Sequence, residues 1–162
     1  MLQYAAMMDR HILSNGYLSA AVRPDGAELC SLRDAEGTEL LWQAHSVWPR
    51  HAPTLFPIVG RLKDDTLRFQ GKAYRLTQHG FARDRRFAWL NRTSTSCRLV
   101  LHDDAETRAV YPFAFRLEVA YALNEDTLER NQGFAKLKRD IDALVAAIVA
   151  YADGQLTAAA AD

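Results

Sequence analysis

The segment that decides the fold is residues 113–123, FAFRLEVAYAL. Large apolar side chains recur there at every second position: Phe113, Phe115, Leu117, Val119 and Tyr121. A period of two is typical of a β-strand with one buried face, because successive side chains point to opposite faces of a sheet. The segment therefore predicts a half-buried strand of an antiparallel sheet.

Shorter segments of similar character surround this strand and are separated by turn residues. We expect strands over residues 18–23, 27–32, 39–42, 66–69, 72–76, 86–92 and 97–102, and a further strand that begins at residues 127–129. Pro24-Asp25-Gly26 and Gln70-Gly71 predict tight turns between neighbouring strands. The chain is therefore expected to be mainly β, with antiparallel sheets.

The composition is that of an ordinary globular domain and excludes several classes of protein. The 162 residues are 49% hydrophobic and 25% charged, unlike a disordered chain. Equal numbers of basic and acidic residues, 20 each, argue against a nucleic-acid partner. No secretory signal is recognised, and the longest apolar run, residues 143–152, is about half of a membrane span, so no membrane partner is expected. Cys30 and Cys97 predict buried free thiols and a cytoplasmic location, with one disulfide as the alternative.

Residues 43–63 differ from the predicted strands and predict a long ordered loop. They contain three prolines among aromatic residues and show little periodicity. Together with residues 78–84, QHGFARD, this loop concentrates the candidate site residues. His45 and His51 lack the spacing of a helical metal pair and are expected to be surface or loop histidines. The sequence shows neither a glycine-rich phosphate loop nor a paired CxxC motif, so no metal or cofactor is expected.

Four residues of this region have side chains suited to a polar ligand. The guanidinium groups of Arg61 and Arg83 offer several fixed hydrogen bonds to hydroxyl or phosphate oxygens. His79 ionises near neutral pH and can therefore donate or accept a proton. Trp48 offers a flat apolar face for the C–H side of a sugar ring. The alternative is that these residues pack the end of a sandwich and that Arg83 forms a surface ion pair with Asp84.

The same residues resemble a known family. The matching motifs run in order from Gly26-Ala27-Glu28-Leu29, through Leu55-Phe56-Pro57-x-x-Gly60-Arg61 and residues 78–84, to Tyr111-Pro112-Phe113. Together they resemble the aldose 1-epimerase (galactose mutarotase-like) family, especially its LacX-like branch. The resemblance covers roughly residues 15–128.

The resemblance implies an antiparallel β-sandwich with a sugar site in a groove on one sheet. It also implies interconversion of the α and β anomers of an aldose without a cofactor, by a histidine acid and a carboxylate base. By resemblance, His79 is the catalytic candidate, assisting near the ring oxygen, and Arg61 contacts the sugar. Arg83 matches an arginine that would contact hydroxyls or a phosphate, so the expected ligand is an aldohexose or hexose phosphate. Trp48 completes the expected substrate-binding set.

The sequence departs from the family pattern near Asn131. Apolar residues then recur at helical spacing over residues 134–149, which predicts an amphipathic helix. The general-acid histidine and glutamate base of the family's second half are not found in the sequence. We therefore expect a truncated sandwich in residues 1–130 and a helical tail in residues 131–162.

Three functions remain open at this point. The first is a mutarotase-like carbohydrate-binding protein in which anomer interconversion is impaired. The second is a non-catalytic sugar-binding module, and the third is a remnant or assembly protein without a sugar site. A homodimer through an exposed sheet edge or through the C-terminal helix is the expected assembly.

Overall fold

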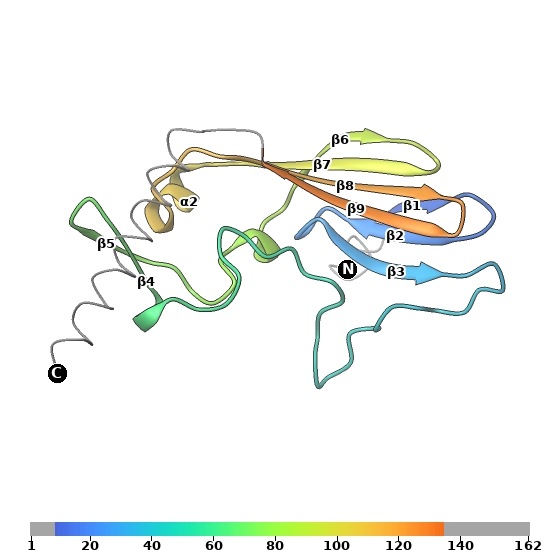
Figure 1. Ribbon diagram of the computed structural model, residues 1–162, viewed down its shortest axis with the longest axis horizontal. Coiled ribbons are helices and arrows are strands. Elements are labelled where there is room, and N and C mark those ends of the chain that lie inside the picture. Colours follow the sequence, from blue (N-terminus) through green and yellow to red (C-terminus); the bar gives the residue numbers. More distant parts are fainter. Residues whose placement is uncertain (1–8, 135–162) are drawn as a thin grey trace, which may run out of the picture.

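Antiparallel strands are the main regular elements of the computed structural model, which describes residues 9–134 (Figure 1). One sheet has the order β1-β2-β3, formed by His11–Ser14, Ser19–Arg23 and Glu28–Arg33. A second has the order β6-β7-β8-β9, formed by Ala88–Arg92, Ser96–His102, Arg116–Asn124 and Thr127–Phe134. A separate hairpin contains β4 (Thr66–Phe69) and β5 (Lys72–Arg75). The helical segments are η1 (Lys63–Asp65), η2 (Ala82–Asp84) and α2 (Ala105–Val110).

Strand β8 supplies the central buried face of the core. Leu117 and Val119 are both 0% exposed, and Tyr121 is 1% exposed, as the period of two predicts. The core joins these side chains to apolar residues of β1, β2 and β3, so the two sheets pack face to face as layers (Figure 1). The Tyr121 hydroxyl also donates a 2.9 Å hydrogen bond to the Ala27 carbonyl, across 94 residues of sequence. Since burying one large apolar side chain contributes about 1.5–3 kcal/mol, this layer interface adds substantially to the stability of the fold.

The expected tight turns and the long loop are confirmed. The Ala27 N–H donates to the Pro24 carbonyl over 3.1 Å, which closes the turn between β2 and β3. Gln70 and Gly71 both have positive φ, 49° and 75°, as a two-residue hairpin turn requires. Among the described residues, the stretch between β3 and η1 contains no strand or helix, as the clustered prolines predict.

The prediction of a strand over residues 39–42 is wrong. Only an isolated bridge joins Glu39 to Arg33. The Glu39 carboxylate accepts hydrogen bonds from the backbone N–H groups of Leu32 and Leu41, over 2.8 and 3.2 Å. The Glu39 carboxylate thus replaces part of the backbone pairing that a strand would make with β3, and the chain turns away from β3.

Helix α2 was not expected from the sequence. The Asp104 carboxylate accepts from the Thr107 backbone N–H over 2.8 Å, and the Thr107 hydroxyl accepts from the Asp104 N–H over 2.9 Å. This reciprocal capping begins the helix. The Asp-x-x-Thr spacing was the available signal, although a helix this short shows no apolar periodicity.

The expected change of character at Asn131 is corrected, because β9 continues to Phe134. Its register runs from Asn124↔Thr127 to Leu117↔Phe134, so residues 131–134 belong to the sheet. Strand β8 offers partners over this whole length, and pairing overrides the helical pattern of the sequence. Except for Phe134, the helix predicted over residues 134–149 lies outside the described residues. None of the helices within residues 9–134 has the length and apolar character needed to cross a bilayer.

The two cysteines are buried free thiols, as expected. The Cys30 thiol donates to the Ala21 carbonyl over 3.2 Å. Burial raises the pKa of Cys97 to about 11, and burial also raises the pKa of Cys30.

We therefore expect neither thiol to react readily in the native protein. At pH 8, alkylation of Cys30 and Cys97 by iodoacetamide should be roughly 100-fold slower than in the urea-unfolded chain, because thiolate is scarce and both sulfurs are covered. Mass spectrometry of the timed reaction measures both rates. Labelling of either native thiol at the unfolded rate would contradict this prediction.

Candidate functional site

The two segments that carry the candidate site are joined through their backbones. Phe56 forms a parallel bridge with Gly80, and the Phe81 N–H donates to the Phe56 carbonyl over 2.9 Å. Gly80 has φ of +69°, and a Cβ at this position would lie 2.1 Å from the Phe56 oxygen. Only glycine permits this approach, so the local sequence His-Gly-Phe brings residues 78–84 against the loop.

An aromatic cluster supports this junction from the core. The Phe56 ring lies 5.9 Å from Phe81, 5.9 Å from Tyr111 and 5.0 Å from Phe115, measured between centroids. Tilted and edge-on contacts at such distances stabilise aromatic pairs beyond the area that they bury. The position of the loop therefore depends on the side chains that precede β8.

His79 is held in one orientation by Gly60. The His79 N–H donates to the Gly60 carbonyl over 2.8 Å, and the Gly60 N–H donates to His79 Nδ1 over 3.0 Å. Since Nδ1 accepts, the neutral ring carries its proton on Nε2. Within the described part of the chain, Nε2 has no protein partner. His79 thus presents a proton donor at a fixed place.

Arg61 directly follows this pair and binds a carboxylate of η1. Its Nε and Nη2 donate to the two Asp65 carboxylate oxygens over 2.6 and 2.8 Å. These hydrogen bonds raise the pKa of Arg61 and lower the pKa of Asp65. The side chain is 63% exposed, so the pair adds little stability, but its two-point geometry orients the guanidinium plane.

Arg83 belongs to a network with the loop segment around Arg50. Its Nη2 donates to the Gln78 carbonyl over 3.1 Å, and its Nε lies 3.5 Å from an Asp84 carboxylate oxygen. Arg50 donates to the other Asp84 oxygen over 2.7 Å. The Arg83–Asp84 pair expected under the packing alternative is therefore present, and the Arg50–Asp84 pair links the two segments of the site.

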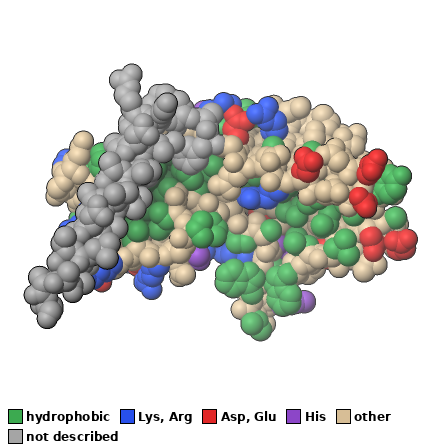
Figure 2. All heavy atoms as spheres, in the orientation of Figure 1, with side chains coloured by type: hydrophobic (Ala, Val, Ile, Leu, Met, Phe, Trp, Pro, Cys, Tyr) green, Lys and Arg blue, Asp and Glu red, His purple; other side chains and the backbone are tan. Residues whose placement is uncertain are grey.

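Trp48 lies on a projection of the long loop. Its carbonyl accepts from the Trp42 indole N–H over 3.0 Å, and its N–H donates to the His45 carbonyl over 3.0 Å. Trp48 is 49% exposed, and Leu40, Trp42 and Val47 are exposed beside it in sequence. Figure 2 shows hydrophobic side chains gathered on a protruding part of the surface. Gly60, which precedes Arg61, is hydrogen-bonded to His79, whereas Trp48 is held by contacts within its own projection.

A buried ionic cluster beside the loop was missed in the sequence. Glu28 is 2% exposed, pairs with Arg23, and accepts from the His51 backbone N–H over 3.0 Å. His51, expected at the surface or in a loop, lies in the loop with its side chain only 14% exposed. Burial lowers the pKa of His51, although Glu28 acts in the opposite direction. In residues 9–134, no group of side chains suited to holding a metal ion is found.

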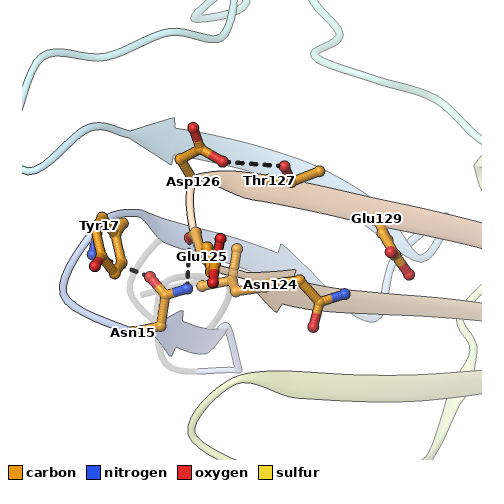
Figure 3. Close-up of a pocket in the computed structure, with 8 residues that line it drawn as sticks. Asn15, Tyr17, Asn124, Glu125, Asp126, Thr127 and Glu129 are labelled. Carbon is orange, nitrogen blue, oxygen red and sulfur yellow. Dashed lines mark hydrogen bonds between the residues drawn. The ribbon is translucent and has the colours of Figure 1, made fainter.

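A polar pocket lies at the opposite end of the sheets from β4 and β5, beside the β8–β9 turn (Figures 1 and 3). The Asn15 amide donates to the Glu125 carbonyl over 2.7 Å and accepts from the Tyr17 N–H over 3.1 Å. Asp126 and Glu129 also line the pocket. Its carboxylates distinguish it from the arginine-containing candidate site.

Comparison with known proteins assigns the family. The Aldose 1-epimerase family model matches residues 9–134. The chain belongs to the aldose 1-epimerase family. Chromosomal protein LacX from Lactococcus lactis subsp. lactis is 35% identical over 118 residues, covering 69% of this chain and 40% of LacX.

Solved structures of similar proteins confirm the fold. A galactose mutarotase related enzyme from Lactobacillus acidophilus is 44% identical with a TM-score of 0.75, covering 76% of this chain and 42% of that chain. A galactose mutarotase-like protein from Lactobacillus casei ATCC 334 is 34% identical with a TM-score of 0.73 and the same coverages, 76% and 42%. This aldose 1-epimerase family chain thus has the expected mainly β, galactose mutarotase-like fold. It spans about two fifths of the length of these relatives.

Proposed function

We propose that this chain is a mutarotase-like carbohydrate-binding protein that contacts an aldohexose through His79, Arg61 and Arg83. The observation that carries the proposal is the reciprocal pair between Gly60 and His79, which leaves the Nε2 proton available to a ligand. A sugar ring oxygen or hydroxyl accepts such a hydrogen bond. Arg61 follows Gly60 in the sequence, and its guanidinium plane is oriented by Asp65.

We further propose that anomer interconversion by this chain is weak. Ring opening needs a base at the anomeric hydroxyl as well as a donor at the ring oxygen. Asp65 is bound to Arg61, and Asp84 is bound to Arg83 and Arg50. Hydrogen bonds to Arg61 lower the pKa of Asp65 and so make that carboxylate a weak base. A non-catalytic sugar-binding module is therefore the second candidate function.

The remaining proposals concern the cellular location and the assembly of the protein. Free buried thiols at Cys30 and Cys97 support a cytoplasmic location. Within residues 9–134, strand β9 lies at one edge of its sheet, so its outer backbone edge is where we propose that a second copy pairs.

The test of the function is His79→Asn. Asparagine tolerates the φ of 67° observed at His79 and can still accept from the Gly60 N–H, while it removes the Nε2 donor. We expect the wild-type ¹H–¹⁵N spectrum to shift at Gly60 and Gly80 on titration with galactose or glucose. The variant should keep its dispersed spectrum and bind about tenfold more weakly, as expected for the loss of one hydrogen bond.

The matched control is His102→Asn, since His102 lies exposed at the end of β7. It should bind sugar as the wild type does. Polarimetry on fresh α-glucose then separates the two candidates: acceleration by the wild type that is lost in His79→Asn supports interconversion, and binding without acceleration supports the module. A folded wild-type protein whose spectrum ignores both sugars would refute the proposed function.

A further inference from the structure

The inner face of β9 carries two polar side chains, Arg130 and Gln132, where β7 and β8 carry apolar ones. Its register places Arg130 opposite Tyr121 and Gln132 opposite Val119, and both partners are buried core residues. Directly opposed residues in a sheet share a face. Two polar side chains of an edge strand therefore point toward the layer in which the apolar core lies.

These two side chains contact the loop that carries the candidate site. Arg130 Nη2 donates to the Thr54 hydroxyl over 3.0 Å, and Gln132 forms a long hydrogen bond of 3.5 Å to the Leu55 carbonyl. Phe56, the next residue, holds Gly80 and Phe81. A short stretch of loop thus lies between β9 and the His79 segment.

The Arg130 guanidinium is held by neutral groups alone. Its Nε donates to the Tyr121 hydroxyl over 3.0 Å, and its carbon lies 5.8 Å from the centre of the Tyr121 ring. Thr54, its other partner, is 0% exposed, and Tyr121 is anchored in turn to the Ala27 carbonyl. Two buried, fixed acceptors therefore restrict a side chain whose residue is itself exposed.

No carboxylate of residues 9–134 forms an ion pair with the Arg130 guanidinium, whereas Arg61 is paired with Asp65 and Arg83 with Asp84. A guanidinium that is oriented in advance and lacks a carboxylate binds an oxyanion strongly, because charge-assisted, two-point hydrogen bonds then form at little entropic cost.

We propose that Arg130 binds an oxyanion carried by the ligand, a phosphate or carboxylate group attached to the sugar. This inference rests on the proposed function for the identity of the sugar, but the oxyanion contact stands on the Arg130 geometry. Arg130 supplies the cation, Thr54 and Tyr121 orient it, and the loop residues 54–56 connect it to the segment that holds His79.

The test compares anionic and neutral sugars on matched variants. Glucose, glucose 6-phosphate, glucuronate and inorganic phosphate are titrated by isothermal calorimetry into the wild type, Arg130→Met and Arg92→Met. Arg92 is a suitable control because it lies on β6, the other edge of the same sheet, with its guanidinium carbon 5.3 Å from the centre of the Trp89 ring.

We expect the wild type and Arg92→Met to prefer at least one anionic sugar over glucose by about tenfold, and Arg130→Met to lose that preference. A phosphate-specific or a carboxylate-specific preference identifies the group. If Arg130→Met loses its dispersed amide spectrum, Arg130→Lys is used in its place. Lysine keeps the positive charge but lacks the planar guanidinium group. The preference for an anionic sugar over glucose should still fall below about threefold.

Two outcomes overturn the inference, and a third separates it from the proposed function. Equal binding of glucose and both anionic sugars by the wild type refutes it, as does an unchanged preference in a folded Arg130 variant. Binding of inorganic phosphate that depends on Arg130, with no binding of glucose, supports the oxyanion contact and refutes the proposed sugar site.

Discussion

Gly80→Ala is expected to lower the free energy of unfolding by more than about 3 kcal/mol and to abolish sugar binding. The added Cβ would lie 2.1 Å from the Phe56 oxygen, 2.5 Å from its carbonyl carbon and 2.6 Å from Pro57 Cδ. These atoms belong to backbone and to a proline ring, so they cannot move aside as a flexible side chain would. The φ of +69° adds strain for any residue with a Cβ.

Urea unfolding followed by tryptophan fluorescence measures this loss. Gly37→Ala is the matched control, because Gly37 has φ of +84° but a Cβ there meets nothing within 4 Å. Gly37→Ala should lower the free energy of unfolding by about 1 kcal/mol, which is the strain of a positive φ alone. If the two variants unfold at the same urea concentration, the Phe56–Gly80 contact does not hold the two segments together.

Phe56→Ala should destabilise the protein by about 3–5 kcal/mol, the usual cost of removing a buried aromatic ring. Phe56 is 3% exposed, and its ring contacts Phe81, Tyr111 and Phe115. Its loss leaves a cavity between the loop and the residues that precede β8. The shape of the site depends on that junction, so sugar binding should weaken in the folded fraction as well.

The comparison for this variant is Val59→Ala, in the same loop. Val59 is 81% exposed, so its truncation should change the free energy of unfolding by less than about 0.5 kcal/mol. Thermal unfolding of both variants beside the wild type checks the contrast. A stable Phe56→Ala protein that binds sugar normally would show that the aromatic cluster does not position the loop.

Sequence periodicity and turn motifs predicted those parts of the fold that depend only on residues close together in the sequence. The alternation that ends in Tyr121 needs only a buried sheet face, and the turn at Gln70-Gly71 needs only its own backbone angles. Strand β9 illustrates the limit. Arg130 and Gln132 contact the Thr54 hydroxyl and the Leu55 carbonyl of the loop, so the strand lacks an apolar alternation. A helical pattern beginning beyond Asn131 also obscured its end.

The candidate site also has a part that could be predicted from short motifs and a part that depends on contacts between distant segments. The motifs identified Arg61, His79 and Arg83, because each lies in a short conspicuous string. The partners of these residues were not predictable in the same way. That Gly60 orients the His79 ring follows from contact between segments 19 residues apart, and the Thr54–Arg130 contact spans 76 residues. Such contacts leave no local trace in the sequence.

The hydrogen bond from Tyr121 to Ala27 has a consequence for folding during synthesis on the ribosome. Tyr121 is synthesised 94 residues after Ala27, so the sheet of β1, β2 and β3 waits that long for the second layer to pack on it. At translation rates of about 5–20 residues per second, that interval is roughly 5–20 seconds. During that interval, the apolar side chains of β2 and β3 lack the layer that β8 later packs against them. Productive folding therefore begins late, and a holdase chaperone that shields this face should raise the yield of native protein.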